Sequence, residues 1–432
     1  MRKNKYVHIV PLNKDFKVIF NGMNYDFIIV FNDVIPSYIE ILNNPGQYIT
    51  THPTIIEEMQ RLKIIVADDF NEKEHLVSKR NNYIQAKEYK TSIIPTFECN
   101  YACWYCTQEH QPVNIEPEKI ELIINHIKTY LLENDIESYV LSWFGGEPLT
   151  QPEIIDYMSG ELRSFCNEHD IEFSGGVTTN GALLTSSTAE ILTKHGINHF
   201  QIAIDGDQET HDKNKFDTIH ESSFNLILSN VANLLRINPD AKITLRFNYT
   251  PATVKKLHLV DEINKFISPE NRGKIRIDLQ HVWQIDERIV KIEDLCKLQR
   301  KFSENGYQFA TDHVFSICYV DKIHYNTIYY NGKVEKCDIR SMDNLRGEID
   351  ADGHIVWHER SIIHDYNIMD KDCCCSDCSY YPVCFCGCPV RREEIIQKSG
   401  TVKCGHTGDF SKLHYRISDY CWRMIHNLKV YA

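Results

Sequence analysis

The sequence predicts an α/β protein whose main part is a partial (β/α)6 barrel. From Thr91 onward, short runs of β-branched and aromatic residues alternate with amphipathic stretches of helical period. This alternation is typical of parallel strands that are joined by helices. The chain has 432 residues, of which 42% are hydrophobic and 25% are charged. These values favour two or three folded domains, at about 150 residues per domain, and exclude disorder as a global description.

Six strands and five helices are expected in the barrel. The strands are Ser92–Phe97, Tyr139–Phe144, Glu172–Thr179, His199–Ile204, Lys242–Tyr249 and Lys274–His281. The helices between them are expected at about 116–133, 151–168, 185–195, 220–236 and 253–267, several of them opening with Pro, Ser or Thr in the first turn. In such a barrel the loops after the strand C-termini form the active face. The distinctive motifs of this sequence all lie in those loops.

Two flanking segments differ from the barrel. A small N-terminal α+β domain is expected to contain a three-strand meander and two short helices: Tyr6–Val10, Lys17–Asn21, Tyr25–Phe31, 36–43 and 54–63. The Lys-Glu-rich stretch around 72–90 is interpreted as a linker. From about 305 the chain has short strands, Gly turns and dense cysteines, so metal is expected to stabilise this region. The expected domains are 1–85, 86–304 and 305–432.

Charge and hydropathy exclude several classes of partner. The 47 basic and 60 acidic side chains give a net charge of −13, which does not favour a grip on nucleic acid phosphates. No stretch approaches the roughly 20 apolar residues of a membrane span. The apolar run near the N-terminus breaks at Pro11, so a signal peptide is not indicated. We therefore expect a cytoplasmic protein without a nucleic acid or membrane partner.

The sixteen cysteines are the most informative part of the composition. A reducing compartment keeps thiols from pairing as disulfides, so metal binding or catalysis is the expected reason for so many. Most of the cysteines fall into two regions of the sequence. One region holds Cys99, Cys103 and Cys106, and the other holds ten cysteines between Cys318 and Cys404. Two metal regions are therefore expected.

The first region is a CxxxCxxC pattern, Cys99-Asn-Tyr-Ala-Cys103-Trp-Tyr-Cys106, directly after the first expected barrel strand. Three thiolates in one short loop can hold three corners of an iron–sulfur cube and leave the fourth iron open. An open iron would be a site for a substrate or a cofactor. The alternative is a zinc knuckle that lacks its fourth ligand.

This loop, with Tyr105 before its last cysteine, resembles the radical S-adenosylmethionine (SAM) superfamily. The next strand ends Trp143-Phe144-Gly-Gly-Glu-Pro148, which is similar to the GGEP motif of that superfamily. There, backbone groups and the acidic side chain bind the amino-acid end of the cofactor. Glycines let a ligand approach the backbone, and a carboxylate can pair with an ammonium group. The resemblance implies a cofactor site that includes Tyr105, Gly145, Gly146, Glu147 and Pro148.

Two further strand ends resemble cofactor contacts of the same superfamily. Thr178-Thr179-Asn180-Gly181 is similar to its third-strand contact, and Ile204-Asp205-Gly206 is similar to its fourth-strand motif. The resemblance adds Asn180 and Asp205 to the expected cofactor site. Asn-Gly and Asp-Gly are also ordinary turn dipeptides, so a purely structural role is the alternative.

The C-terminal cysteines have a second regular spacing. Cys318 and Cys337 flank Gly332, and a CxxC-x5-C-x3-C run follows, with Cys404 after it. This spacing resembles the SPASM domain, which holds two auxiliary [4Fe-4S] clusters in peptide-modifying radical SAM enzymes. The implied ligands are Cys318, Cys337 and Cys388 for one cluster, and Cys375, Cys378, Cys384 and Cys404 for the other. Two zinc sites with the same ligands are the alternative.

Some details of these sites stay open at the level of sequence. The surplus thiols Cys373, Cys374 and Cys386 blur the ligand assignment, and Cys386 either replaces a neighbour or is a bystander. The cluster of Cys318 lacks a fourth cysteine, so Asp312, His313 or a thiolate of the substrate would complete it. The sequence identifies no general base, so the catalytic residues are unknown.

The resemblance implies an enzyme that cleaves SAM reductively at the cluster of Cys99 and uses the 5′-deoxyadenosyl radical to abstract a hydrogen atom. The expected function is maturation of a ribosomally made precursor peptide, by a thioether or C–C cross-link. The expected cofactors are SAM and three [4Fe-4S] clusters, with flavodoxin or ferredoxin as the electron donor. Residues 1–85 would bind the leader of the peptide as an added strand, or would only cap the barrel. The alternatives are an anaerobic sulfatase-maturing enzyme that forms formylglycine and a non-catalytic leader-binding metal scaffold.

Overall fold

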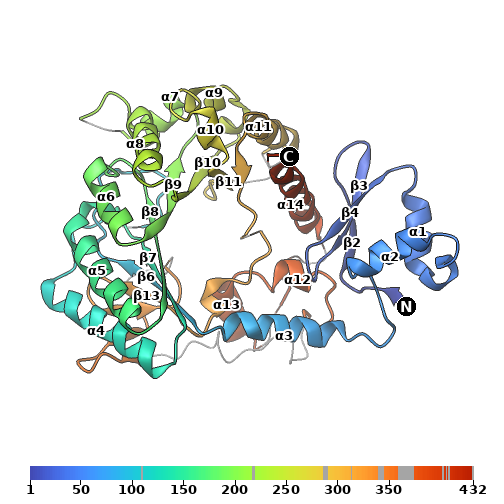
Figure 1. Ribbon diagram of the computed structural model, residues 1–432, viewed down its shortest axis with the longest axis horizontal. Helices are drawn as coiled ribbons and strands as arrows, with labels where there is room; N and C mark the ends of the chain where they lie inside the picture. Colours follow the sequence, from blue (N-terminus) through green and yellow to red (C-terminus); the bar gives the residue numbers. More distant parts are fainter. Residues whose placement is uncertain are drawn as a thin grey trace. The chain divides into compact units, whose positions relative to one another are not determined.

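The structure is a computed structural model. It describes the chain except for residues 109, 217–218, 286–289, 313, 339–344, 359–373, 401–402, 405, 407–408 and 431–432. Two compact units are present (Figure 1). The first unit consists of Met1–Ala86, Thr311–Ile323 and Ser361–Leu428, and the second consists of Lys87–Ala310, His324–Arg360 and Lys429–Ala432. These units cut across the three expected segments, because parts of the region after residue 305 belong to each of them.

The second unit is built on a parallel series of strands that follow one another in sequence order. They are β6 (Glu88–Ile94), β7 (Ser138–Trp143), β8 (Glu172–Thr179), β9 (Ile197–Ile204), β10 (Lys242–Tyr249) and β11 (Ile275–His281). Each strand pairs in parallel with the next one. The predicted α/β fold with six strands in barrel order is therefore confirmed.

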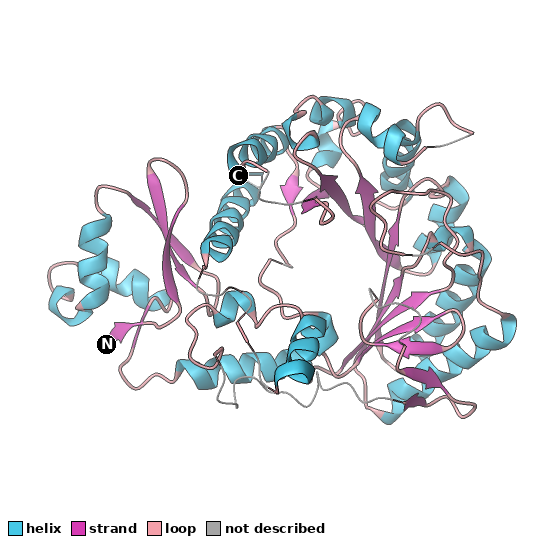
Figure 2. Cartoon of the chain, turned by 180° about the vertical axis from the view of Figure 1, so that it is seen from behind, coloured by secondary structure: helices cyan, strands magenta, loops and turns pink. Residues whose placement is uncertain are grey.

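The helices of the second unit lie along the outer side of the curved sheet (Figures 1 and 2). They are α4 (Pro117–Glu133), α5 (Pro152–Glu168), α6 (Ser186–Lys194), α7 (Gln208–Asn214), α8 (Ser223–Ile237), α9 (Leu259–Ile263), α10 (Pro269–Arg272) and α11 (Ile292–Glu304). Proline begins α4 and α5, as expected from its fixed backbone angle. The expected helix at 253–267 is wrong, because this segment forms only the 3₁₀ turn η3 (Thr253–Lys255) and the short α9.

The sheet continues beyond the six expected strands. On one side β12 (Gln308–Phe309) pairs in parallel with β11. On the other side β13 (Tyr325–Tyr329) pairs in parallel with β6, and three antiparallel strands follow: β14 (Lys333–Glu335), β15 (Gly347–Ile349) and β16 (Ile355–Trp357). Sequence order does not show that a strand after residue 324 returns to β6. The strands of residues 325–357 therefore extend the barrel sheet.

A buried hydrogen-bond chain fixes this returning strand. The Asn326 amide donates to Tyr89 Oη at 3.2 Å, and Tyr89 Oη lies 3.1 Å from His126 Nε2. The other ring nitrogen of His126 is 2.7 Å from the carbonyl oxygen of Gly353, which can only accept. His126 therefore donates from Nδ1 and accepts at Nε2, and burial lowers its pKa, which favours this neutral form. The chain joins β6, α4, β13 and the turn before β16.

The first unit contains the expected N-terminal meander. Its antiparallel sheet has the order β2 (Val7–Pro11), β3 (Phe16–Asn21) and β4 (Phe27–Phe31), and β1 (Arg2–Lys3) pairs with β5 (Ile65–Val66). Helix α1 (Ile35–Asn43), the 3₁₀ helix η1 (Pro45–Tyr48) and helix α2 (Pro53–Arg61) pack on one face of the sheet. The expected helices near 36–43 and 54–63 are thus present.

The interpretation of 72–90 as a linker is wrong. Residues Glu72–Ile84 form helix α3, and β6 begins at Glu88. The Asn71 side chain caps this helix by accepting from the Glu74 backbone N–H at 3.1 Å. Its high content of charged residues suggested an exposed tether, but Leu76 and Arg80 are buried. A cap and a few buried positions were enough to stabilise the helix.

The C-terminal part of the chain completes the core of the first unit. It forms α12 (Tyr381–Cys384), α13 (Pro389–Ser399) and α14 (Ser411–Val430). Ile417 and Cys421 of α14 pack in one cluster with Val10, Val18 and Phe20 of the meander. The N-terminal segment and the cysteine-rich end therefore share a hydrophobic core.

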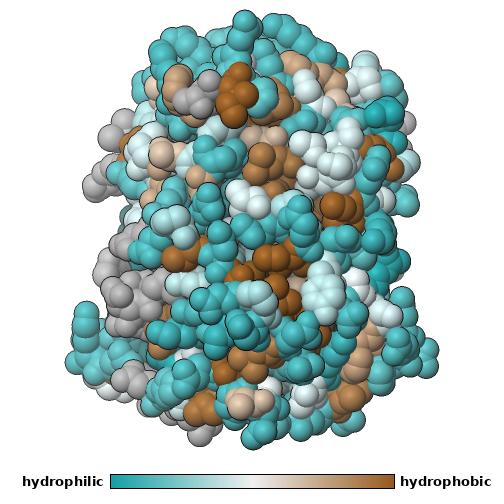
Figure 3. Space-filling model, turned by 90° about the vertical axis from the view of Figure 1, so that its left-hand side faces the viewer, coloured by the Kyte–Doolittle hydropathy of each residue, from teal (hydrophilic) through white to brown (hydrophobic). Residues whose placement is uncertain are grey.

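The outer surface is mainly polar on the face shown in Figure 3, where hydrophobic side chains form separate patches. Leu132 on α4 and Tyr157 on α5 are examples of half-exposed apolar residues. Within the described part of the chain, no helix has both the length and the apolar character needed to cross a membrane.

Trp143 is expected to be a main contributor to the stability of the second unit. Its side chain is fully buried on β7, and its indole N–H donates to Ser159 Oγ on α5 at 3.1 Å. Trp143→Ala should lower the free energy of unfolding by about 3–5 kcal/mol, because it leaves a large cavity and an unpaired hydroxyl group. Denaturant unfolding followed by circular dichroism measures this change. Trp283→Ala is the matched control, since Trp283 is 69% exposed, and an equal loss there would contradict the prediction.

Candidate active site

The CxxxCxxC motif lies in a closed loop at the C-terminal end of β6. After the loop the chain returns beside its start, because Phe97 N and Thr96 Oγ1 both donate to Val113 O, at 3.2 and 2.9 Å. Ile115 N donates to Pro95 O at 2.9 Å. These bonds tie the two ends of the loop together and hold the three cysteines above the parallel strands.

The three cysteines of this loop differ in exposure. Cys99 and Cys103 are partly buried and Cys106 is exposed. Burial, together with the nearby Glu147, Cys103 and Cys106, raises the pKa of Cys99 to about 11. Burial also raises the pKa of Cys103, whereas the charge of Lys215 lowers it. The thiols therefore lie close enough to influence one another and face at least one cation.

The chemistry of this donor set fits an iron–sulfur cube. In a cube each thiolate binds a different iron, so three cysteines of one loop need not converge on a single point. Across the described residues, no group of three or more His, Cys, Asp or Glu side chains could hold a single metal ion. Cys99, Cys103 and Cys106 would hold the cluster, and the loop would leave its fourth iron accessible.

The two glycines after β7 allow a close approach of two backbones. A Cβ atom on Gly146 would lie 2.2 Å from Glu98 O, and one on Gly145 would lie 2.6 Å from Thr96 O. Gly145 also has a φ of +129°, which other residues rarely adopt. Gly146 N donates to Thr96 O at 3.1 Å. These glycines thus let the turn after β7 approach the backbone at the start of the cysteine loop.

Glu147 joins the ends of β7 and β8. Its carboxylate is fully buried and accepts from Leu149 N at 3.1 Å, from Thr179 Oγ1 at 2.7 Å and from Asn180 N at 2.7 Å. Burial raises its pKa to about 7, although these three donors favour the charged form. Pro148 follows at the start of the 3₁₀ helix η2 (Pro148–Thr150), which Glu147 caps. The structure thus gives Glu147 a role in positioning the two loops.

Asn180 reaches from the end of β8 toward the cysteine loop. Its amide nitrogen donates to Asn100 Oδ1 at 2.7 Å and lies 3.9 Å from Cys99 Sγ. Its side-chain oxygen accepts from Ala182 N at 2.9 Å. The expected site residue Asn180 is therefore brought next to the first cysteine of the motif.

A buried ion pair joins the cysteine loop to the end of β9. Lys215 Nζ lies 2.6 Å from Asp205 Oδ2, and both side chains are almost completely buried. Tyr105 Oη donates to the same carboxylate at 2.6 Å, and Lys215 also donates to Tyr105 Oη at 3.0 Å. Burial and then the Asp205 charge raise the pKa of Tyr105 far above its usual value, so the phenol keeps its proton. Asn248 on β10 adds a bond to Asp205 at 3.1 Å.

The electrostatics of this pair favour a charged Asp205. Burial alone would raise the pKa of Asp205, but Lys215 and the other groups around it lower the net value below the ordinary one. The backbone N–H of Asp205 donates to His211 Nδ1 at 3.1 Å, so the proton of the neutral imidazole is on Nε2. Burial lowers the pKa of His211 to about 3. Asp205 and Lys215 are thus the charged pair, and His211 is neutral.

Sequence reasoning did not include Lys215 or His211 among the expected site residues. Both follow Asp205 in the chain and lie in or beside α7, an element that the sequence did not predict. A Lys and a His in a polar segment usually face solvent, so only their burial shows that they serve the site. By contrast, Tyr105, Glu147, Asn180 and Asp205 were expected and are brought together at the C-terminal ends of β6–β9.

Comparisons with known proteins agree with this geometry. Residues 93–245 match the radical SAM superfamily. The segment covers the cysteine loop, the Gly-Gly-Glu-Pro turn and Asp205. The chain is an enzyme with a radical SAM domain. Its cofactors are S-adenosylmethionine and a [4Fe-4S] cluster.

Two curated relatives of this radical SAM enzyme are distant in sequence. The chain is 20% identical over 361 residues to the radical SAM cyclopropyl synthase TigE of Paramaledivibacter caminithermalis, and the match covers 73% of each chain. It is 23% identical over 334 residues to a cysteine-type anaerobic sulfatase-maturating enzyme of Clostridium novyi, which covers 68% of this chain and 86% of the relative.

The fold of the radical SAM enzyme also resembles a solved structure. The structure of native anSMEcpe with bound AdoMet and the Cp18Cys peptide has a TM-score of 0.55 and 16% sequence identity. The match covers 79% of this chain and 98% of that chain. At this identity the likeness shows the shared fold.

The second group of cysteines lies mainly in the first unit. Cys374 Sγ and Cys375 Sγ are 3.8 Å apart, and Cys384 Sγ lies 3.5 Å from His406 Nε2. Burial raises the pKa of Cys378, and the neighbouring Cys375 and Cys404 raise it further. Four expected ligands of one auxiliary cluster, Cys375, Cys378, Cys384 and Cys404, are thus in one unit.

The other expected auxiliary ligands are divided between the units. Cys318 and Cys388 belong to the first unit and Cys337 belongs to the second. The surplus thiol Cys386 packs in the cluster of Cys375 and Tyr381. Cys373 and His313 lie outside the described residues. The ligand sets of both auxiliary clusters therefore stay predictions.

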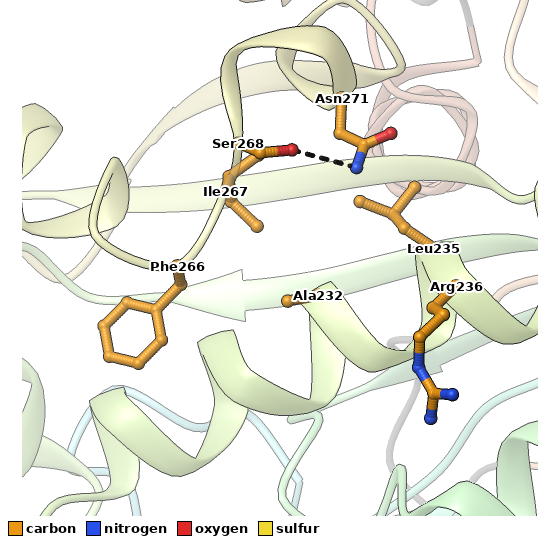
Figure 4. Close-up of a pocket in the computed structure, with 7 residues that line it drawn as sticks. All are labelled: Ala232, Leu235, Arg236, Phe266, Ile267, Ser268 and Asn271. Atoms are coloured by element: carbon orange, nitrogen blue, oxygen red, sulfur yellow. Dashed lines mark hydrogen bonds between the residues drawn. The ribbon is translucent and has the colours of Figure 1, made fainter.

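A cavity of about 340 Å³ lies between α8 and the turn before α10 (Figure 4). Ala232 and Leu235 form one wall, and Phe266 and Ile267 form another, with Ser268 Oγ accepting from the Asn271 amide at 3.2 Å. These segments precede the N-terminal ends of β10 and β11. The cavity thus lies at the opposite end of the strands from the radical SAM motifs, and none of the candidate residues lines it.

The Asp205–Lys215 pair is expected to stabilise the protein only as a pair. Asp205→Asn or Lys215→Met alone should lower the free energy of unfolding by about 3–5 kcal/mol, because each leaves a buried charge without its partner. The double substitution should cost clearly less than the sum of the two. Denaturant unfolding of the iron-free chain measures all three variants, and strictly additive losses would refute the coupling.

Proposed function

We propose that this radical SAM enzyme modifies a ribosomally synthesised precursor peptide, by an intramolecular thioether or C–C cross-link. The coarser class is that of radical SAM maturases. One relative is named a cyclopropyl synthase and another a sulfatase-maturating enzyme, and the similar solved structure contains a bound peptide. These names support a peptide or protein as the substrate of this chain.

The observation that carries the proposal is the part of this chain that the anSMEcpe structure does not match. That structure is matched over 98% of its own chain but over only 79% of this one. About a fifth of this chain is therefore additional, a share similar to that of residues 1–86 of the first unit. A maturase of precursor peptides has a use for an additional module, because it must recognise a leader as well as the modified residues.

The meander of the first unit has a suitable edge for a leader peptide. Among the described strands, β4 lies at the edge of its sheet and pairs with β3 alone, and its Ile29 and Phe31 side chains are 43% and 58% exposed. The other edge strand, β2, is contacted by the C-terminal helix, since Ser418 Oγ donates to Pro11 O at 2.6 Å. An extended peptide can add to such an open edge through backbone hydrogen bonds. We therefore assign leader binding, rather than capping alone, to the β4 edge.

The second candidate function is maturation of a sulfatase by formation of formylglycine. The specific observation in its favour is the Clostridium novyi relative, whose length is matched to 86%. The modified product separates the two candidates, since formylglycine forms on one Cys or Ser, whereas a cross-link joins two residues. The non-catalytic scaffold is not retained, because the chain is an enzyme with a radical SAM domain.

The residues of the radical SAM domain would divide the work as follows. Cys99, Cys103 and Cys106 would hold the cluster, which together with SAM supplies the radical chemistry when bound. The Gly145–Gly146 turn and Glu147 would fix the loops around the cofactor. Asp205 and Lys215 would hold Tyr105, and hence the cysteine loop, in place. The C-terminal cysteines would form a SPASM domain with two auxiliary [4Fe-4S] clusters, and a flavodoxin or ferredoxin would deliver the electron.

Iron analysis tests the three-cluster proposal. Anaerobically reconstituted protein should bind about twelve irons, four for each cluster. The triple substitution of Cys99, Cys103 and Cys106 by Ala should remove about four irons and all formation of 5′-deoxyadenosine, while it leaves the auxiliary clusters. A content of about four irons per chain together with stoichiometric zinc would refute the SPASM assignment. Cleavage of SAM by the triple variant would refute the assignment of the cluster ligands.

Substitutions at the β4 edge test the leader-binding proposal. Ile29→Lys with Phe31→Lys should weaken binding of the full precursor at least tenfold, because buried contacts with the peptide become charged. Cleavage of SAM without substrate should stay unchanged. The precursor would be the peptide encoded by a short neighbouring reading frame, with mass spectrometry after anaerobic co-expression as the readout of the product. Ile49→Lys is the matched control, since Ile49 is 44% exposed but lies outside the sheet. Equal affinity of the edge variant and the control would favour the capping role.

A further inference from the structure

The cysteine loop folds back on itself, so that a histidine after the motif lies next to one of its cysteines. Residues 113–115 pair with residues 95–97, through the bonds of Val113 O and Ile115 N and a β-bridge between Thr96 and Asn114. The Asn114 side chain is anchored by the Gln151 amide at 2.9 Å. The chain is therefore anchored against the start of the loop when it returns at Val113.

His110 lies in this returning segment and contacts a cysteine of the motif. Its Nε2 atom is 3.4 Å from Cys106 Sγ, within hydrogen-bond distance for sulfur. A thiolate that ligates iron carries no proton and can only accept. With Cys106 as a cluster ligand, the imidazole must therefore donate its Nε2 proton to the sulfur.

We infer that His110 is a positioning residue of the cluster, whose N–H donor to the Cys106 sulfur raises the reduction potential of the radical SAM cluster. Reduction adds one electron to the cluster, and part of the added negative charge resides on the thiolate sulfurs. An N–H donor stabilises this charge and so favours the reduced state. The electron comes from an external low-potential donor, and the imidazole keeps its proton. The inference rests on the proposed assignment of Cys106 as a ligand.

The other nitrogen groups near the cysteines are less suited to this role. Asn180 Nδ2 lies 3.9 Å from Cys99 Sγ and already donates to Asn100 Oδ1 at 2.7 Å. Lys215 is paired with Asp205 at 2.6 Å, which offsets its charge. Of these described side chains, His110 makes the shortest contact with a cysteine sulfur. Its partner Cys106 is the exposed cysteine of the loop. The sulfur of Cys106 would lose hydrogen bonds from water when water is excluded, and the His110 N–H would replace them.

A redox titration of the reconstituted full chain tests the inference. The signal of the radical SAM cluster is identified by electron paramagnetic resonance, because added SAM changes the spectrum of a cluster with an open iron. At the midpoint potential of the wild type, His110→Ala should lower the ratio of reduced to oxidised cluster about tenfold, which is about 59 mV for a one-electron couple. His110→Gln, which keeps an N–H donor, should restore part of this ratio.

The control is His169→Ala, which removes an exposed histidine whose Nδ1 bonds to Phe165 O on α5. It should leave the ratio unchanged. A ratio in His110→Ala equal to that of the wild type and the control would overturn the inference. Absence of any SAM-responsive cluster in the wild type would instead refute the assignment of the site.

A measurement on the wild type covers the case in which His110→Ala does not retain the cluster. Protein labelled with ¹⁵N-histidine should show hyperfine coupling between the reduced, SAM-responsive cluster and a histidine nitrogen, because the hydrogen bond joins the two. His110→Gln should lack that coupling. A reduced cluster without any ¹⁵N coupling in the wild type would overturn the inference.

Discussion

The active face of this protein depends on the close approach of two backbones at the ends of β6 and β7. Gly146 N and Glu147 N donate to Thr96 O and Glu98 O, at 3.1 and 2.8 Å, and no side chain fits between the two segments. This contact places the start of the cysteine loop directly against the turn after β7. The carboxylate of Glu147 then carries the connection on to the end of β8. As a result, the loops at the C-terminal ends of β6, β7 and β8 are fixed relative to one another.

A buried ion pair fixes the other end of the cysteine loop. Asp205 and Lys215 could not remain charged in the interior without each other, and Tyr105 shares their hydrogen bonds. The residue between two cysteines of the motif is thus bound to the end of β9. Because the backbone contact and the ion pair act on opposite ends of the same loop, they limit the positions that a cluster ligand can take. Such pre-organisation suits a cofactor that must be held and shielded from water.

In the first unit, the N-terminal meander and the C-terminal helix α14 pack against each other. Phe20 of the meander and Ile417 of α14 belong to one hydrophobic cluster, although nearly four hundred residues separate them in the sequence. The N-terminal segment is therefore not an independent appendage, and its open β4 edge is part of a unit that also contains cysteines. The proposed leader-binding edge and the cysteines Cys375, Cys378, Cys384 and Cys404 thus belong to the same compact unit.

The sequence by itself determined the α/β class, the six parallel strands and the residues of the two motifs. Hydrophobic period and cysteine spacing are local properties, so they can be read along the chain. The tertiary structure decided the rest. It returned β13 to the edge of β6, turned the expected linker into α3, and buried Lys215 against Asp205. Pairing between distant segments and burial of a charge depend on which surfaces meet, and no local pattern records that.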